Sequence, residues 1–169
     1  MKYLISGLAL GLALSPASFA QDTADTTADQ AMVDAYMAAY SAADFDAMEP
    51  YMAEDVVFLD PTATGMGDAG LAHHSRADIM AALREFSERN NPIGLNFEWD
   101  FSYESNNRYV FIGSVNATYP TQEAGTLFVW SAPQTTVIHV RDGQVVEQWD
   151  IVDYEGARQE LIPAGSADQ

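Results

Sequence analysis

Residues 141–150 read RDGQVVEQWD. The triplet Arg141-Asp142-Gly143 predicts a tight turn, because Asp-Gly pairs favour the backbone angles that lead one antiparallel strand into the next. The segment from Gln144 to Asp153 then predicts a strand. On the other side of the turn, residues 125–131 and 135–140 predict one long strand with a bulge or bend at Ala132-Pro133, where proline cannot donate to a sheet ladder.

The predicted sheet extends from this hairpin toward the N-terminus. Phe97, Trp99, Phe101 and Tyr103 alternate with polar residues, and this period of two predicts a strand with one aromatic, buried face. Asn106-Asn107 predicts the turn into a return strand over residues 109–119. On the C-terminal side of the hairpin, residues 154–161 predict a last short helix.

Helical periods precede the sheet. A first helix is predicted from Asp29, and Asp44 can cap a second, short one. Residues 56–60 predict a short strand ended by Pro61, and the Gly-rich residues 62–74 predict a loop. The capping-box sequence Ser75-Arg76-Ala77-Asp78 begins a third helix that ends at Asn90-Asn91-Pro92. The apolar faces of the first two helices consist of Met32, Val33, Tyr36, Met37 and Tyr40, and of Phe45, Met48, Tyr51 and Met52.

Three helices followed by a run of antiparallel strands form an α+β pattern. Helices that lie across the concave face of a bent sheet leave a pocket between the two layers. The sequence shows no repeat and no linker, so we expect one domain over residues 29–162, with a C-terminal tail over residues 163–169.

The N-terminus has the order of a secretory signal peptide. Lys2 precedes an apolar run from Leu4 to Leu14, Pro16 breaks the run, and Ser18-Phe19-Ala20 supplies small residues for cleavage. The alternative is a transmembrane anchor, but the run has about half of the roughly 20 residues that a bilayer requires. We therefore expect residues 1–20 to be removed, residues 21–28 to form a flexible leader, and the protein to be periplasmic or secreted without a membrane anchor.

The composition is strongly acidic. The chain has 25 acidic and 7 basic residues, a formal charge of −18, and cleavage after Ala20 would remove Lys2 and leave −19. Such a surface repels phosphate backbones and anionic lipid headgroups, which argues against nucleic acids and membranes as partners. The chain has no cysteine, so a hydrophobic core must supply its stability in a compartment that would permit disulfides.

Several short motifs carry a family resemblance. They are Tyr36, Asp44-Phe45-Asp46, the sequence MAEDV at residues 52–56, Asp60-Pro61 and the hairpin at residues 141–150. With these motifs, residues 29–161 resemble the nuclear-transport-factor-2-like (NTF2-like) superfamily, and within it the SnoaL-like and ketosteroid-isomerase-like proteins. The resemblance implies a strongly curved mixed or antiparallel sheet wrapped around the N-terminal helices into a cone. It also implies an apolar pocket for a hydrophobic small molecule and a homodimer.

The resemblance further implies a site for acid/base chemistry. Ketosteroid isomerases remove a proton beside a carbonyl with an aspartate and hold the enolate oxygen with a tyrosine and a protonated aspartic acid. By this resemblance Asp60 corresponds to the base and Tyr36 to the oxyanion tyrosine, while Phe86 corresponds to a pocket phenylalanine. The protonated acid has no counterpart, because its position falls near Thr136, a weaker hydrogen-bond donor. Trp99 belongs to the aromatic stripe that would line the pocket.

A second carboxylate, Asp150, is the expected partner of Asp60. Gln148, Asp150 and Val152 lie on one face of the last predicted strand, and that face lines the pocket in the family. Asp150 corresponds to a functional aspartate of SnoaL-like cyclases, whereas His139 lies three residues from the position of their histidine. Two carboxylates that face one cavity suit general acid/base catalysis.

Two classes of function stay open at this point. The first is a cofactor-independent isomerase, cyclase or hydrolase that acts on a hydrophobic small molecule. The second is a non-catalytic ligand-binding or dimeric assembly module, in which Asp60 is an ordinary strand exit, Tyr36 a core residue and Asp150 a surface charge. His73 and His74 match no metal-ligand spacing, so we expect them to be solvated and expect no metal or cofactor.

Overall fold

The computed structural model describes residues 23–63 and 70–166, so the predicted signal peptide lies outside the described residues. The described part contains three α-helices, two short 3-10 helices and a seven-stranded sheet. The helices are α1 (Thr23–Ser41), α2 (Phe45–Met48), η1 (Glu49–Tyr51), α3 (Arg76–Asn90) and η2 (Ala164–Ser166). The strands are β1 (Met52–Asp60), β2 (Leu71–His73), β3 (Gly94–Ser105), β4 (Arg108–Pro120), β5 (Thr126–Arg141), β6 (Gln144–Val152) and β7 (Arg158–Pro163). The expected α+β class is confirmed.

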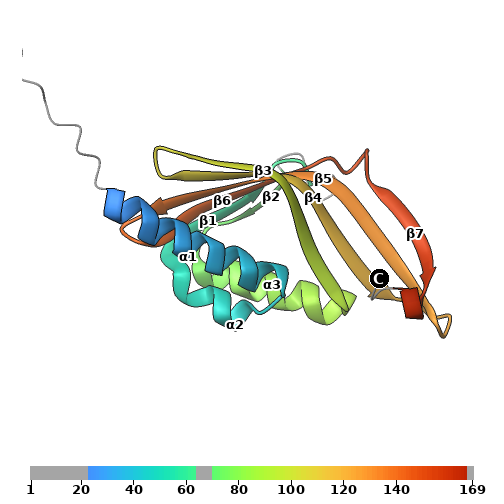
Figure 1. Ribbon diagram of the computed structural model, residues 1–169. Helices are drawn as coiled ribbons and strands as arrows, with labels where there is room; N and C mark the ends of the chain where they lie inside the picture. The colour runs from blue at the N-terminus through green and yellow to red at the C-terminus, as the bar shows by residue number, and fades with distance from the viewer. Residues whose placement is uncertain (1–22, 64–69, 167–169) are drawn as a thin grey trace, which may run out of the picture.

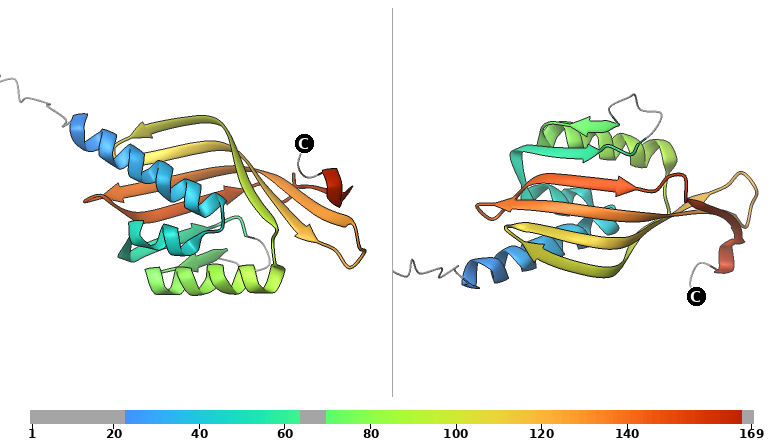
Figure 2. Two further views of the ribbon diagram at one scale, coloured as in Figure 1. Left: turned by 60° about the horizontal axis from the view of Figure 1, so that its bottom comes forward. Right: turned by 90° about the horizontal axis from the view of Figure 1, so that it is seen from above.

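The helices cover one face of a curved, mixed sheet. The strand order is β2-β1-β6-β5-β4-β3, with β7 paired to β5, and the β1–β6 pair is parallel whereas the other pairs are antiparallel. In Figures 1 and 2, α1, α2 and α3 lie on the same side of the sheet, and part of β3, β4 and β5 bends toward the C-terminal end of α3. The opposite face of the sheet carries no helix in the described residues. This curvature leaves room between helices and sheet.

Strand β5 changes partners halfway along its length. It pairs with β4 from Leu127 to His139, with β6 from Gln134 to Arg141, and with β7 from Thr126 to Ser131. The bulge predicted at Ala132-Pro133 is wrong, because the register with β4 continues through both residues, whereas the partner on the other side of β5 does change there from β7 to β6. Proline fits there because its missing N–H falls where one neighbouring strand has ended and the other has not begun.

The predicted helix over residues 154–161 is wrong, because residues 158–163 form strand β7. Without β7, one side of β5 from Thr126 to Ser131 would present unpaired N–H and C=O groups. Residues 158–163 pair with that edge. Tertiary pairing therefore decides the structure of this segment over its local preference.

A β-bulge divides the aromatic stripe of β3. Trp99 pairs with Gly113 and Phe101 pairs with Ile112, so Asp100 is the extra residue of the bulge on β3. The extra residue reverses the alternation. Phe97 is buried, whereas Phe101 and Tyr103 are 59% and 49% exposed. The prediction of one continuous buried face is correct before the bulge and wrong after it.

The remaining differences lie at the boundaries of elements. Helix α1 begins at Thr23 rather than Asp29. A short strand, β2, lies within the predicted loop 62–74. The two predicted helix caps are confirmed: Asp44 accepts a hydrogen bond from the backbone N–H of Ala47, and Ser75 accepts one from that of Asp78.

Two groups of buried side chains form the core. The larger group joins α1 and α3 to β1, β4, β5 and β6, and it includes Val33, Tyr36, Val56, Ile79, Ile138 and Val140. The smaller group joins Phe97, Val115, Ala132 and Val152, with Tyr40 and Trp130 packed against it. Among the described helices, none has both the length and the apolar character of a membrane-spanning segment.

Candidate active site

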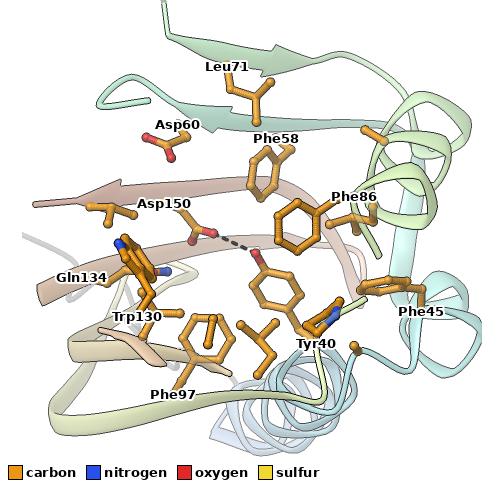
Figure 3. A pocket seen from close by; sticks show the side chains of 18 of the residues that line it. Tyr40, Phe45, Phe58, Asp60, Leu71, Phe86, Phe97, Trp130, Gln134 and Asp150 are labelled. Carbon is orange, nitrogen blue, oxygen red and sulfur yellow. Dashed lines mark hydrogen bonds between the residues drawn. The ribbon is translucent and has the colours of Figure 1, made fainter. Parts of the chain in front are cut away.

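The space between the helices and the curved sheet is a cavity of about 640 Å³. This volume is in the range of small-molecule sites. Aromatic side chains from the three α-helices, from β1, β3, β4 and β5, and from the segment before β7 supply much of the lining (Figure 3): Tyr40, Phe45, Phe58, Phe86, Phe97, Tyr119, Phe128, Trp130 and Tyr154. The two buried acids Asp60 and Asp150 also line it, each only 4% exposed.

Strand register brings the two carboxylates together. Phe58 pairs with Gln148 and Leu59 with Trp149 in the parallel β1–β6 ladder, and one further step along it places Asp60 beside Asp150. Neighbouring strands lie about 4.8 Å apart. Both side chains point to the same interior in Figure 3. The two acids that the sequence singles out therefore line the same cavity.

Asp150 lies at the centre of a buried network in which every neighbour donates to it. Its Oδ1 accepts hydrogen bonds from Thr136 Oγ1 at 2.7 Å and from Gln148 Nε2 at 3.2 Å. Its Oδ2 accepts from Tyr40 at 3.1 Å and from Gln148 Nε2 at 3.2 Å. Gln134 Nε2 supports the network from behind by donating to Thr136 Oγ1 at 2.8 Å. These contacts occupy the roughly four acceptor positions of a carboxylate.

Burial and hydrogen bonding act on the pKa of Asp150 in opposite directions. Burial disfavours the charged form and raises the pKa to about 6, although the hydrogen bonds from Thr136, Gln148 and Tyr40 lower it. The nearby charge of Asp60 adds to the rise. A carboxyl group with this pKa exchanges a proton near neutral pH, which is the property that a general acid or base requires.

Asp60 has a different set of partners. Its Oδ1 accepts from the backbone N–H of Thr62 at 2.9 Å and from the Thr62 hydroxyl at 2.6 Å. Its Oδ2 accepts from the hydroxyl of Tyr154 at 2.6 Å. Thr62 in turn accepts from the backbone N–H of Val152, which ties this end of β1 to the end of β6. Three bonds leave one acceptor position of the Asp60 carboxylate open.

The cavity includes some of the other predicted site residues and not all of them. Phe86 and Val152 line it, whereas Tyr36, Trp99, Thr136 and Gln148 do not. Thr136 and Gln148 lie behind Asp150 as its donors. Trp99 stacks on Phe97, with ring centroids 5.2 Å apart, and packs against Phe111.

The sequence predicts Tyr36 as the tyrosine of the cavity, but the structure places Tyr40 there instead. Both residues are on the apolar face of α1, one helical turn apart. Tyr36 is buried deeper and donates its hydroxyl hydrogen to Gln148 Oε1, whereas Tyr40 reaches the cavity and Asp150. Burial and the charge of Asp150 raise the pKa of Tyr40 well above its ordinary value, so this hydroxyl stays protonated as a donor.

Three further site residues escaped the sequence reasoning. Gln134 and Trp130 belong to β5, and Tyr154 follows β6 in the segment predicted as a helix. Burial, together with the hydrogen bond to Asp60, raises the pKa of Tyr154 above its ordinary value. The alternation of β5 places Trp130, Gln134 and Thr136 on one face, which is the signal that could have identified two of them. The described residues contain no cluster of three or more His, Asp or Glu able to hold a metal ion.

Comparison with known proteins gives a family and a set of structures with the same fold. The profile of the SnoaL-like domain matches residues 33–148. No protein with a curated description matches the chain. A candidate SnoaL-like polyketide cyclase from Shewanella denitrificans is 21% identical, with a TM-score of 0.64 over 76% of this chain and 92% of that chain.

Two other structures resemble this chain at lower identity. TerC, crystallised with polyporic acid, is 18% identical, with a TM-score of 0.60 over 75% of this chain and 92% of that chain. A LEH-like epoxide hydrolase from Mycobacterium tuberculosis is 15% identical, with a TM-score of 0.57 over 77% of this chain and 86% of that chain. At these identities the similarity shows the shared fold.

Proposed function

This chain belongs to the SnoaL-like domain family, and on that premise we propose that it is a cofactor-independent enzyme that moves a proton on an apolar small molecule. The observation that carries the proposal is the pair of buried acids, Asp60 and Asp150, side by side at one cavity. Aromatic walls suit a flat, hydrophobic substrate. The candidate polyketide cyclase and the epoxide hydrolase-like protein of the same fold make isomerase, cyclase or hydrolase chemistry the nearest classes.

The free acceptor position makes Asp60 the base of the proposed reaction. As a carboxylate it takes a proton from a carbon next to a substrate carbonyl, and the electron pair of the broken C–H bond moves to the carbonyl oxygen. Thr62 and Tyr154 fix the carboxylate while it does so. Return of the proton to another carbon completes an isomerisation. Attack of the enolate carbon on a second carbonyl moves the electron pair to that carbonyl's oxygen, and transfer of the proton from Asp60 to this oxygen completes a cyclisation.

Tyr40 and Asp150 would stabilise the negative charge on the substrate oxygen. When Asp150 is protonated, its O–H can donate to the oxygen of Tyr40, and the Tyr40 hydroxyl hydrogen is then free to turn into the cavity. A hydrogen bond aimed at the developing oxyanion lowers the barrier more in an apolar cavity than in water. The raised pKa of Asp150, about 6, supports this role because it keeps part of the population protonated near neutral pH.

The test uses 5-nitrobenzisoxazole, a flat aromatic compound that opens to a coloured phenolate when a base removes its C–H proton. We expect wild-type protein to accelerate this reaction and Asp60→Asn to lose about 10²-fold or more, because a positioned base contributes 10² to 10⁴ in rate. Asp46→Asn is the matched control, since Asp46 is exposed on α2, forms an ion pair with Arg84 and does not line the cavity. Equal rates for Asp60→Asn and wild type would overturn the proposal.

A second candidate function, assembly of two chains, rests on the uncovered face of the sheet. Cross-strand pairing aligns Phe101, Ile112, Thr135 and Ile151 in one row across β3, β4, β5 and β6. A parallel row contains Tyr103, Val110, Val137 and Trp149. Five of these side chains are exposed large hydrophobics. We call these eight residues the outer patch, and we propose that it pairs with the outer patch of a second copy.

We also propose that the protein is exported. The support is the charged, apolar and small-residue order of residues 1–20 in the sequence. Intact mass measurement of the protein recovered from the periplasm or medium should give a chain that begins at Gln21. Recovery of the full 169-residue chain would contradict export with cleavage.

A further inference from the structure

A histidine that the proposed chemistry does not use also lines the cavity. His73 lies on β2 and pairs with Phe58 of β1, while Leu71 pairs with Asp60. Phe58 and Asp60 are two residues apart on β1, and so are Leu71 and His73 on β2. All four side chains line the cavity, so His73 is on the same wall as Asp60.

One nitrogen of the His73 ring is already occupied. Nδ1 lies 3.1 Å from Oδ2 of Asp78, a carboxylate outside the cavity lining that also accepts a hydrogen bond from the backbone N–H of His74. Because a carboxylate accepts, Nδ1 carries the proton and Nε2 presents a lone pair in the neutral ring. Within residues 23–63 and 70–166, Nε2 has no hydrogen-bond partner, and the His73 side chain is only 18% exposed.

The His73–Asp78 contact is not needed to cap α3. Ser75 already accepts from the backbone N–H of Asp78 at the first turn of the helix. The contact instead fixes the ring beside Phe58, with ring centroids 6.4 Å apart. A half-enclosed imidazole with one nitrogen held and the other open is the usual arrangement of a histidine that contacts a ligand.

We propose that Nε2 of His73 accepts a hydrogen bond from the ligand, and that the ligand is a flat, apolar ring system with a polar group at each end. One polar group lies at Asp60 and Asp150, and the other, a hydroxyl, lies at His73. Asp60 and His73 lie on neighbouring strands and two residues apart along the strand direction, which corresponds to about 8 Å between them. The inference rests on the proposed function only in that the cavity takes a flat small molecule.

The experiment compares two probes of the same shape. 2-Naphthol carries one hydroxyl, and 2,6-dihydroxynaphthalene carries two, at opposite ends of the ring system. Calorimetric titration of wild-type protein should show the diol binding about fivefold or more tightly, from one added hydrogen bond plus a twofold statistical advantage. In His73→Phe the preference should fall to about twofold, while 2-naphthol binding is unchanged. His73→Gln, which restores an acceptor, should recover the preference.

His74→Phe is the matched control, because His74 is the exposed neighbour and does not line the cavity. A preference for the diol that survives in His73→Phe would overturn the role of His73 and leave the cavity site intact. If neither probe binds the wild type, both the inference and the small-molecule site are overturned. Loss of 5-nitrobenzisoxazole turnover in Asp60→Asn is a separate readout, so the two proposals can fail independently.

Asp78 is the positioning residue for His73. In Asp78→Ala the Nδ1 proton loses its acceptor, and the two neutral tautomers should then mix. Two-bond ¹H–¹⁵N NMR spectra of the ring distinguish the tautomers, and they should show the Nδ1–H form in the wild type and a mixture in the variant. A wild-type ring protonated mainly at Nε2 would contradict the proposed acceptor.

Discussion

The hydroxyl of Tyr40 donates a 3.1 Å hydrogen bond to Oδ2 of Asp150, which joins α1 to β6 across 110 positions of sequence. Among residues 23–63 and 70–166, Tyr40 is the one direct donor to the Asp150 carboxylate that also lines the cavity. The other direct donors to Asp150, Thr136 and Gln148, do not line the cavity. The hydrogen bonding of the Tyr40 hydroxyl in the cavity should therefore depend on whether Asp150 is protonated.

Removal of this hydroxyl should change the titration of Asp150. In Tyr40→Phe one of the hydrogen bonds that lower the pKa is lost, so the pKa of Asp150 should rise above about 6. Carboxyl ¹³C NMR titration measures this pKa directly. Tyr36→Phe is the contrast, because Tyr36 bonds to Gln148 and not to Asp150, so its effect should be smaller. An unchanged pKa in Tyr40→Phe would show that the bond does not form in solution.

The buried carboxyl of Asp150 should make stability depend on pH. The ordinary pKa of an aspartic acid, 3.8, applies to the unfolded chain, and the pKa of Asp150 is about 6 in the folded protein. Between pH 3.8 and pH 6 the folded protein therefore binds one proton more than the unfolded chain. The free energy of unfolding therefore falls as pH rises through this window, by about 3 kcal/mol in all. Asp150→Asn removes the titration, so the difference in unfolding free energy between it and wild type should change by most of that amount between about pH 4 and pH 7.

Urea unfolding of both proteins at several pH values measures this difference. Asp46→Asn serves as control, because it makes the same substitution at an exposed carboxylate outside the site. The test is how the difference in free energy of unfolding changes with pH, and not its size at one pH, because asparagine also changes the hydrogen bonds of the site. Parallel curves for wild type and Asp150→Asn would be the contrary result.

Gly113 should be essential to the bulge in β3. A Cβ atom at this position would lie 1.9 Å from the backbone oxygen of Glu98, so any other residue must push β3 away from β4. We expect Gly113→Ala to lower the free energy of unfolding by about 1–3 kcal/mol, as overpacking does. Gly94→Ala is the control on the same strand pair, because its Cβ would meet only Thr118 at ordinary contact distance. Equal midpoints in urea would show that the strands tolerate the extra methyl.

The outer patch should hold a dimer together. Native mass spectrometry of the wild type should give the mass of two chains, and Ile112→Lys should give one, because a charge cannot be buried cheaply at the centre of an apolar contact. Leu161→Lys is the control, since Leu161 is also an exposed apolar residue but lies on β7, outside the outer patch. A single-chain mass for the wild type at micromolar concentration would refute assembly through this face.

Local patterns in the sequence predict much of the fold and part of the site. Period-two and helical spacings define the main elements, and the position of Asp60 and Asp150 follows from strand alternation and the family motifs. Three features depend on tertiary structure instead. β7 forms because β5 has an open edge, the bulge at Asp100 depends on the close approach of Gly113, and β2 forms against the end of β1.

Dependence on tertiary structure also explains why some residues lie elsewhere than the sequence predicts. Tyr36 and Tyr40 share one helix face, and only the depth of the cavity decides which of them reaches it. His73 looks like a solvated loop residue until β2 pairs with β1 and Asp78 holds its ring. Side-chain depth and short strands are set by packing, which the period of a sequence does not encode.

The parallel pairing of β1 with β6 has a consequence for the order of folding. β3, β4, β5 and β6 follow one another through short connections and can pair locally, whereas β1 pairs with residues of β6 that lie about ninety positions later in the chain. Contacts that close a long loop form late, because chain entropy opposes them until the rest of the sheet exists. Asp60 and Asp150 would then meet only at the last step. Substitutions at this junction should accelerate unfolding more than they slow folding, so these two carboxylates should also be the first part of the molecule to separate.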